Sequence, residues 1–251
     1  MKVYKFGGAS VRNADGVRNL AHIVEGEDDL FIIVSAMGKT TNALERVFTH
    51  MQNGRKEEAN EEIKQVQAYH AEIIDDLWGE PTNINEVTLL FGQLRNIVND
   101  IVYRSSDAEL WYDTIVAYGE LISTTIISKY LNHIGMRNRW IDMRTTLLTN
   151  QRHKDANVDI KASKHRLRAS IENTGVGIFV GQGFIGGAPD GTTTTLGREG
   201  SDYSAAVVAN ILSAESMSVW KDVEGVLNAD PKIFKDAVKI DALNYLDTIE
   251  L

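Results

Sequence analysis

Nearly unbroken apolar runs alternate along this chain with stretches in which apolar residues recur every three or four positions. The apolar runs lie at 3–6, 30–34, 176–180 and 217–220. A strand of a parallel sheet has this character when both of its faces are covered by other elements. We therefore expect strands at these four places and helices between them.

The intervening sequence is predominantly helical in its pattern. From 42 to 131 it is rich in charges and periodic in its apolar positions, and 159–173 has the same character. Short strands are expected at 137–141 and 146–149, and Asp190-Gly191 between polar segments predicts a hairpin turn. Because strands alternate with helices, the pattern predicts an α/β fold that opens as a doubly wound sheet.

Composition narrows the function without identifying it. The 251 residues carry a formal charge of −9, with 43% hydrophobic and 24% charged residues and no cysteine. The negative charge argues against a nucleic-acid binder, although a nucleotide needs only a few local donors or a metal ion. Disulfides, thiolate zinc sites and a cysteine nucleophile are excluded. No apolar run approaches the length of a membrane span and no signal-peptide region is recognisable, so a cytoplasmic location is expected.

The most distinctive stretch runs from Thr195 to Tyr203, where an arginine between glycines leads into a helical pattern. Ser201 is expected to be the N-cap of that helix, whose unpaired N–H groups favour anions. Arg198 adds a guanidinium fork that can hold a carboxylate through two hydrogen bonds. Asp202 is favourable at a helix start on dipole grounds alone. An ordinary capped helix after a turn explains the same residues, and this stretch alone does not separate the two interpretations.

Two strand ends have residues that suit phosphate groups. Lys5 ends the first strand and two glycines follow it. Glycine lets a backbone approach a phosphate closely, and lysine neutralises charge, although a tight turn with a solvent-facing lysine is the commoner explanation. Lys221 and Asp222 follow the strand at 217–220, at the end where ligands collect in open α/β sheets. A surface turn is the alternative there.

Two further segments have the character of a small polar-ligand site. Gly38-Lys39-Thr40 resembles part of a P-loop, but Ile33 stands where that motif needs its first glycine. Hydroxyl groups at Ser35 and Thr41 still line this turn. Gly119-Glu120 lies inside a helical pattern, where a glycine costs about 1 kcal/mol relative to alanine and so has a packing or access reason. The carboxylate could receive an ammonium group, although a solvent-exposed glutamate is more frequent. The six histidines show no ligand spacing or aspartate partners and are expected to be structural.

Taken in order, these motifs resemble the aspartate kinase branch of the amino-acid kinase family. The resemblance is carried by KFGGAS at 5–10, VSAMGKTTN at 34–42, YGELIS at 118–123, GFIG at 183–186, TTLGREGSDYSAA at 194–206, VWKDVEGV at 219–226 and ADPK at 229–232. The family implies ATP-dependent phosphorylation of the side-chain carboxylate of L-aspartate to 4-phospho-L-aspartate, the first step towards lysine, threonine and methionine. It also implies an αβα sandwich around a mainly parallel sheet.

The resemblance assigns roles to individual residues. Lys5 and Asp202 would be catalytic, with Lys5 on the transition-state charge and Asp202 orienting the groups around it, through magnesium or water. The substrate would be bound by Ser35, Thr41, Glu120, Arg198 and Ser201. The nucleotide would be bound by Lys5, Gly7, Gly8, Lys221, Asp222 and Lys232. L-Aspartate and ATP with Mg²⁺ are the expected ligands, without a protein metal site, nucleic acid or membrane partner, and with a homodimer as a possible assembly.

The chain departs from the family pattern at Ala117, Glu199, Lys221 and Lys232. Glu199 adds negative charge beside an anion site, and we expect it to point away from the ligands. The resemblance implies one catalytic domain over 1–251, with an amino-acid lobe to about 175 and a nucleotide lobe from about 176. Because the chain stops before the segment that completes the family's nucleotide site, we expect that lobe to be truncated, with no ACT regulatory domain.

Two other functions remain open at this point. One is a non-catalytic domain that still binds aspartate but has lost a complete nucleotide site. The other is a sister activity of the same fold, such as an acylglutamate, glutamate or uridylate kinase. Calorimetry with aspartate and ATP separates the first alternative, and substrate competition separates the second.

Overall fold

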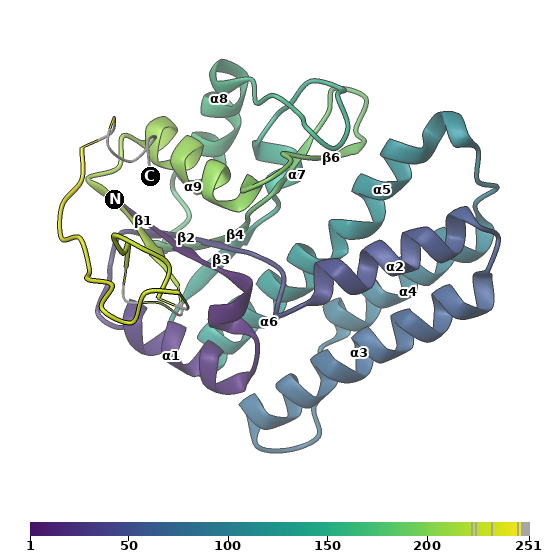
Figure 1. Cartoon of the computed structure of the whole chain (residues 1–251), viewed down its shortest axis with the longest axis horizontal. Coiled ribbons are helices and arrows are strands. Elements are labelled where there is room, and N and C mark those ends of the chain that lie inside the picture. Colours follow the sequence, from purple (N-terminus) through teal and green to yellow (C-terminus); the bar gives the residue numbers. More distant parts are fainter. Residues whose placement is uncertain (222, 224, 232, 245, 247–251) are drawn as a thin grey trace. The chain divides into compact units, whose positions relative to one another are not determined.

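The computed structural model describes residues 1–221, 223, 225–231, 233–244 and 246 (Figure 1). The chain divides into two compact units, Met1–Trp220 and Lys221–Leu251. Among the described residues no helix combines the length and the apolar character needed to cross a membrane.

A five-stranded parallel sheet forms the middle layer of the first unit, with the strand order β3-β4-β2-β1-β7. The strands are β1 (Lys2–Phe6), β2 (Leu30–Val34), β3 (Asn138–Ile141), β4 (Ile178–Gln182) and β7 (Ser216–Trp220). In the register of the sheet, Lys5 on β1 lies opposite Ile33 on β2 and Val219 on β7. The four strands predicted from apolar runs are confirmed, and so is the one expected at 137–141.

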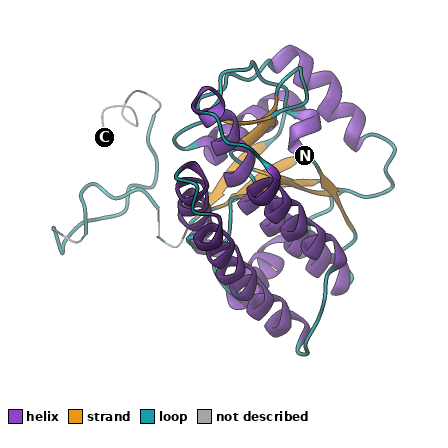
Figure 2. Cartoon of the chain, turned by 90° about the vertical axis from the view of Figure 1, so that its right-hand side faces the viewer, coloured by secondary structure: helices purple, strands orange, loops and turns teal. Residues whose placement is uncertain are grey.

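Helices cover both faces of this sheet, as Figure 2 shows for the strands between the helical layers. On one side, α1 (Ala14–Val24) and α6 (Tyr118–His133) lie against the sheet. Four more helices, α2 (Thr40–Gln52), α3 (Lys56–Trp78), α4 (Asn85–Asp100) and α5 (Ala108–Val116), pack against one another and against α6 and extend beyond the sheet (Figure 1). On the other are α7 (Met143–Thr146), α8 (Ile160–Ile171) and α9 (Gly200–Leu212). Two short 3-10 turns, η1 (Gly8–Val11) and η2 (Ser105–Asp107), complete the helical elements described. The predicted αβα sandwich is confirmed.

The unbroken apolar run at 30–34 follows directly from these two layers. Successive side chains of a strand point to opposite faces of the sheet. Leu30, Ile32 and Val34 accordingly belong to the core beneath α1 and α6. Phe31 and Ile33 belong to the core beneath α8 and α9. A strand buried on both faces has no position left for a polar side chain, and β2 has none.

The remaining elements of the first unit include a two-stranded antiparallel hairpin, β5 (Ile185–Gly187) and β6 (Thr193–Thr195). Its turn is the predicted one, in which Gly191 has φ +85° and the Thr192 N–H donates to Asp190 Oδ1 at 3.0 Å. The strand expected at 146–149 is wrong. The Asp142 side chain caps α7 by accepting from the Arg144 N–H, and this helical turn ends at Thr146. Leu148 and Thr149 then form only isolated bridges.

The second unit holds a turn at Asp230, whose carbonyl accepts from the N–H groups of Ile233 and Phe234 at 3.0 and 2.8 Å. Leu227 and Lys239 form an isolated antiparallel bridge. Of the residues expected on the nucleotide side, Lys221 belongs to this unit and is exposed. Asp222 and Lys232 lie outside the described residues, so their roles stay predictions.

Candidate functional site

The site is built around a buried lysine at the end of β1. Lys5 is 5% exposed, and its Nζ lies 2.7 Å from Oδ1 of Asp202. The period of the strand turns Lys5 to the same face as Val3, which α9 covers. Asp202 stands in the first turn of α9, where the helix dipole favours a negative charge. The ion pair offsets the desolvation cost of partly burying the two charges, and it fixes the position of the ammonium group.

Glu120 faces the same region from α6. A Cβ on Gly119 would stand 2.8 Å from Cβ of Ala36, so only glycine lets α6 approach the turn after β2. This approach brings Glu120 Oε1 to 3.1 Å from the Ala36 N–H, which donates to it. The packing reason predicted for Gly119 is confirmed. A solvent-exposed Glu120 is ruled out, because its side chain is 2% exposed.

The second oxygen of Glu120 has an unusual environment. Oε2 is buried and has no hydrogen-bond partner among the described residues. Burial raises the pKa of the Glu120 carboxyl to about 8, and the Ala36 N–H acts in the opposite direction. A carboxyl group in this situation is stabilised by any cation that reaches it. The arrangement is therefore suited to an ammonium ligand.

Lys5, Glu120 and Asp202 open onto one cavity of about 250 Å³. Its lining is Lys5, Ser35, Thr41, Glu120, Phe184, Gly197, Glu199, Gly200, Ser201 and Asp202. The structure thus brings together every residue predicted to contact the substrate except Arg198. The segments that supply them are the end of β2 and the first turns of α2, α6 and α9.

The start of α9 differs from the prediction in one detail. The helix begins at Gly200, and its N-cap is Glu199, which has φ +56° and makes no capping hydrogen bond with its side chain. Ser201 is therefore not the N-cap, because the left-handed turn at Glu199 starts the helix earlier. Instead Ser201 lies so close to Gly183 that a Cβ on that glycine would stand 2.6 Å from the serine Oγ. Ser201 keeps its place in the cavity lining.

Two residues in left-handed backbone conformation line the cavity, Phe184 with φ +68° and Glu199 with φ +56°. Such conformations are unfavourable for residues other than glycine and cluster at functional sites. The N–H of Phe184 donates to Ser204 Oγ at 2.9 Å, which holds the strained residue against α9. Phe184 was not predicted as a site residue, although it stands in the GFIG motif. Because Glu199 lines the cavity, the expectation that it turns away from the ligands is not supported.

Arg198 lies between two lining residues but is not one itself. Its side chain is exposed, and it makes no hydrogen bond or ion pair with any residue that the structure describes. A guanidinium in this position is available to a carboxylate that enters from solvent. Its predicted role on the substrate stays a prediction.

The two glycines after Lys5 have different surroundings. A Cβ on Gly8 would stand 2.4 Å from the carbonyl oxygen of Ala36, so Gly8 allows η1 to pack against the turn after β2. The Gly38 N–H donates to the Gly8 carbonyl at 2.9 Å across this contact. Among the residues that the structure describes, a Cβ on Gly7 would meet only Lys5 Nζ, at 3.8 Å. Gly7 therefore leaves space beside the ammonium group, as a bound phosphate would require.

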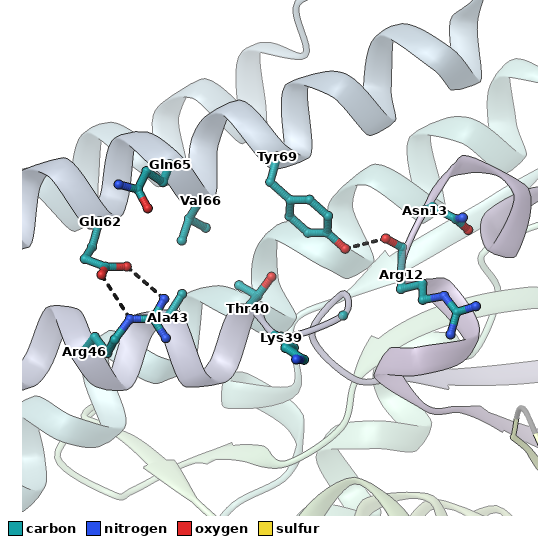
Figure 3. Close-up of a pocket in the computed structure, with 11 residues that line it drawn as sticks. Arg12, Asn13, Lys39, Thr40, Ala43, Arg46, Glu62, Gln65, Val66 and Tyr69 are labelled. Carbon is teal, nitrogen blue, oxygen red and sulfur yellow. Dashed lines mark hydrogen bonds and ion pairs between the residues drawn. The ribbon is translucent and has the colours of Figure 1, made fainter.

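A larger cavity of about 500 Å³ lies on the other side of the Gly38–Thr40 turn, between η1, α2 and α3 (Figure 3). Arg46 and Glu62 form an ion pair across it at 3.0 Å, and the Tyr69 hydroxyl donates to the Arg12 carbonyl. None of the predicted site residues that the structure describes lines this cavity. The residues with the predicted chemistry converge on the smaller one.

Asp113 was missed by the sequence analysis. Its fully buried carboxylate accepts hydrogen bonds from His153, Lys154 and Thr195. Burial raises the pKa of Asp113, and the hydrogen bonds from these three residues oppose that rise. The sequence offered no aspartate partner for any histidine, but His153 has one in the structure. No local pattern could have revealed a partnership between residues 113, 153 and 195.

Comparison with known proteins shows that this chain is similar to kinases. A model of the amino acid kinase family matches residues 1–251. Lysine-sensitive aspartokinase 3 of Escherichia coli (strain K12) is 30% identical over 251 residues, which are 99% of this chain and 55% of that protein. The aspartokinase of Chlamydia trachomatis is 31% identical over 99% of this chain and 55% of its own length. The chain thus spans about half the length of these curated relatives.

A solved structure of E. coli aspartokinase III in complex with aspartate and ADP has a similar fold. Its TM-score with this chain is 0.85 at 30% sequence identity, covering 96% of this chain and 53% of that one. An aspartate kinase structure from Clostridium acetobutylicum, at 23% identity and a TM-score of 0.81, shows the same fold.

Proposed function

Because the chain belongs to the amino acid kinase family, we propose that it transfers the γ-phosphoryl group of ATP to the side-chain carboxylate of L-aspartate. The product is 4-phospho-L-aspartate. The similarity to two aspartokinases at 30% and 31% identity supports this choice of substrate. The observation that carries it is the buried Oε2 of Glu120, which has no hydrogen-bond partner among the described residues and faces a cavity that also contains the Lys5–Asp202 pair.

Glu120 would bind the α-ammonium group of aspartate. With its pKa raised to about 8, the Glu120 carboxyl is protonated at neutral pH as long as no cation is beside it. An ammonium group at hydrogen-bond distance favours the ionised form, so binding of the amino acid would release the proton. A keto acid or a dicarboxylic acid without the amine lacks this interaction. Glu120 therefore favours amino acids over other small dicarboxylates.

The remaining polar groups of the cavity suit the carboxylates of the substrate. Ser35, Thr41 and Ser201 line it with hydroxyl donors, and the last of these lies at the start of α9, where backbone N–H groups also favour anions. The guanidinium of Arg198 would bind a carboxylate from the solvent side through two hydrogen bonds. The small volume, about 250 Å³, suits an amino acid of this size.

The chemistry requires placement and charge compensation more than covalent catalysis. The side-chain carboxylate of aspartate is ionised at neutral pH and needs no general base. One of its oxygens forms a bond to the γ-phosphorus, and the bond from that phosphorus to the bridging oxygen of ADP breaks. Lys5 would compensate the charge on the transferred group, held in position by Asp202 at 2.7 Å. Gly7 and Gly8 would let the phosphates approach it, and Lys221, Asp222 and Lys232 would contact the nucleotide.

Magnesium would enter with ATP as part of the substrate. Among the described residues no group of three or more acidic or histidine side chains could hold a metal ion by itself. Two acidic residues, Glu199 and Asp202, line the cavity, and Mg²⁺ is commonly bound by one or two carboxylates together with phosphate oxygens. The donor set therefore fits a metal–nucleotide complex, in which the ion would neutralise phosphate charge.

A hydroxylamine-trapping assay tests the proposal directly. The protein is incubated with ATP, Mg²⁺ and L-aspartate, and the acyl phosphate is captured as aspartyl hydroxamate. We expect hydroxamate with L-aspartate and none with L-glutamate or succinate. Calorimetric binding of aspartate without any hydroxamate would instead identify a non-catalytic aspartate-binding domain and refute the proposed reaction.

A further inference from the structure

A buried carboxylate outside the cavity connects three segments that lie far apart in the sequence. Asp113, on α5, is 0% exposed. Its Oδ2 accepts from His153 Nδ1 at 2.9 Å, and the Lys154 N–H donates to both oxygens at 3.1 and 3.0 Å. The N–H and the hydroxyl of Thr195 donate at 3.0 and 2.6 Å. These donors saturate the carboxylate, which makes it a junction between α5, the loop at 150–158 and β6.

This junction is directly connected to the wall of the substrate cavity. Thr195 is the last residue of β6, and the chain passes from it through Leu196 to Gly197, which lines the cavity. A Cβ on Gly197 would stand 3.2 Å from both the Lys154 carbonyl oxygen and Asp155 Oδ1. Gly197 therefore rests on the same loop that Asp113 holds. Any shift of that loop or of β6 moves Gly197 and the arginine next to it.

The loop at 150–158 is held in its conformation by contacts with residues outside the loop. Lys154 has φ +66°, a left-handed conformation that is unfavourable for lysine. Its N–H donates to the Asp113 carboxylate. Its ammonium group lies 4.6 Å from the centre of the ring of Tyr112, the residue before Asp113. Apart from this anchor, the Ala156 N–H pairs with the Thr195 carbonyl at 3.0 Å. Strain of this kind persists where the surroundings impose it.

We propose that Asp113 is a positioning residue for the amino-acid side of the site. It fixes the position of Gly197 and thereby the approach of Arg198 to the substrate. The inference rests on the proposed function and deepens it. Asp113 touches no substrate itself. It acts through the loop and β6, so its loss affects the binding of aspartate and leaves the nucleotide side, supplied by β1 and η1, unchanged.

The test uses two isosteric variants and one matched control. Asp113→Asn replaces one acceptor oxygen by an amide that cannot accept, and Thr195→Val removes one donor while keeping the shape. Thr125→Val is the control, because Thr125 is also buried and its hydroxyl also makes one short hydrogen bond, at 2.7 Å to the Leu121 carbonyl, away from the cavity. All three retain a full set of packed atoms. Thermal unfolding confirms that each variant is folded.

The measurement compares the effect of each variant on aspartate binding with its effect on ATP binding. We expect the KM and the calorimetric Kd for aspartate to rise about 10-fold in Asp113→Asn and about 3-fold in Thr195→Val, because small misplacements of a binding group cost this much or more. The KM for ATP should stay within about twofold in both, and Thr125→Val should change neither constant. Equal losses for aspartate and ATP, or an unchanged aspartate affinity, would overturn the positioning role.

Hydrogen exchange separates this inference from the proposed function. In Asp113→Asn, amide exchange should accelerate at 153–156 and 195–200 and remain at the wild-type rate in β1 and α6. A wild-type protein that binds no aspartate would refute the proposed function, and the positioning of 195–200 would then be judged by exchange alone. Unchanged exchange in that segment overturns the inference in either case.

Discussion

Replacing Glu120 with glutamine should make the fold more stable at alkaline pH while it weakens the binding of aspartate. Glutamine has the shape of glutamate, and its Oε1 can still accept from the Ala36 N–H that now lies 3.1 Å from the glutamate oxygen. The amide does not ionise. The variant therefore removes one property of Glu120, the cost of a buried negative charge, and leaves the packing around Gly119 unchanged.

The magnitude follows from the pKa of Glu120, which burial raises from 4.5 to about 8. Between these two values the folded protein binds a proton that the unfolded chain has released, so the free energy of unfolding falls as pH rises. The stability contributed by the protonated carboxyl is fully present below pH 4.5 and is lost as pH rises through about 8. Integrated from pH 5 to pH 9, the loss is about 4 kcal/mol.

The variant should lack this dependence. At pH 5, where the wild-type carboxyl is neutral, the variant should be less stable than the wild type by about 1–3 kcal/mol, because its Nε2 has no described partner. At pH 9 the glutamine variant escapes the ionisation cost, but its Nε2 occupies the place of Oε2 without a described partner and costs about 1–3 kcal/mol. The net expectation is a variant more stable than the wild type by about 1–3 kcal/mol at pH 9.

Urea unfolding at pH 5, 7 and 9 measures this difference, with Glu58→Gln as the control because Glu58 is exposed on α3. Calorimetry with aspartate at pH 7 should show affinity lowered by about 10- to 100-fold in Glu120→Gln, since a charge-assisted hydrogen bond is lost. Parallel pH profiles of wild type and variant would refute the buried, titrating carboxyl. Unchanged aspartate affinity would refute its role on the ammonium group.

Three further changes test the site. Lys5→Ala should lower turnover about 10²- to 10³-fold in the hydroxamate assay, the scale for one preorganised charge-stabilising donor, and an effect under about tenfold would contradict the phosphate role. Arg198→Lys should weaken aspartate binding in calorimetry, because a point charge cannot replace the guanidinium fork, and unchanged affinity would count against that pairing. Gly8→Ala should destabilise the fold by about 1–3 kcal/mol in thermal unfolding, since its Cβ would stand 2.4 Å from the Ala36 carbonyl, whereas Gly7→Ala should cost much less. Equal effects of the two glycine variants would disprove the packing role of Gly8.

Short-range patterns in the sequence were sufficient for the architecture. The run at 30–34 predicted a strand covered on both faces, and β2 is that strand, because a side chain's burial there depends only on its position in the strand period. The hairpin turn at Asp190 followed from neighbouring residues, and the helix expected at 159–173 is α8, which has Asp159 as its N-cap. The strand expected at 146–149 did not form, because α7 still includes Thr146 and the next residues pair only as isolated bridges, Leu148 with Gly187 and Thr149 with Val158.

The sequence by itself determined the αβα fold and the set of polar residues available at the ends of its strands. Only the tertiary structure decided which of those residues are buried and which groups they contact. Glu120 is a buried carboxyl rather than a surface charge because Gly119 brings α6 against Ala36, a contact across 84 positions of the chain. Asp113 became a junction only when α5, the 150–158 loop and β6 met around it. Periodicity reports which face of an element is buried, but a pKa or a hydrogen-bond set depends on neighbours that are distant in sequence.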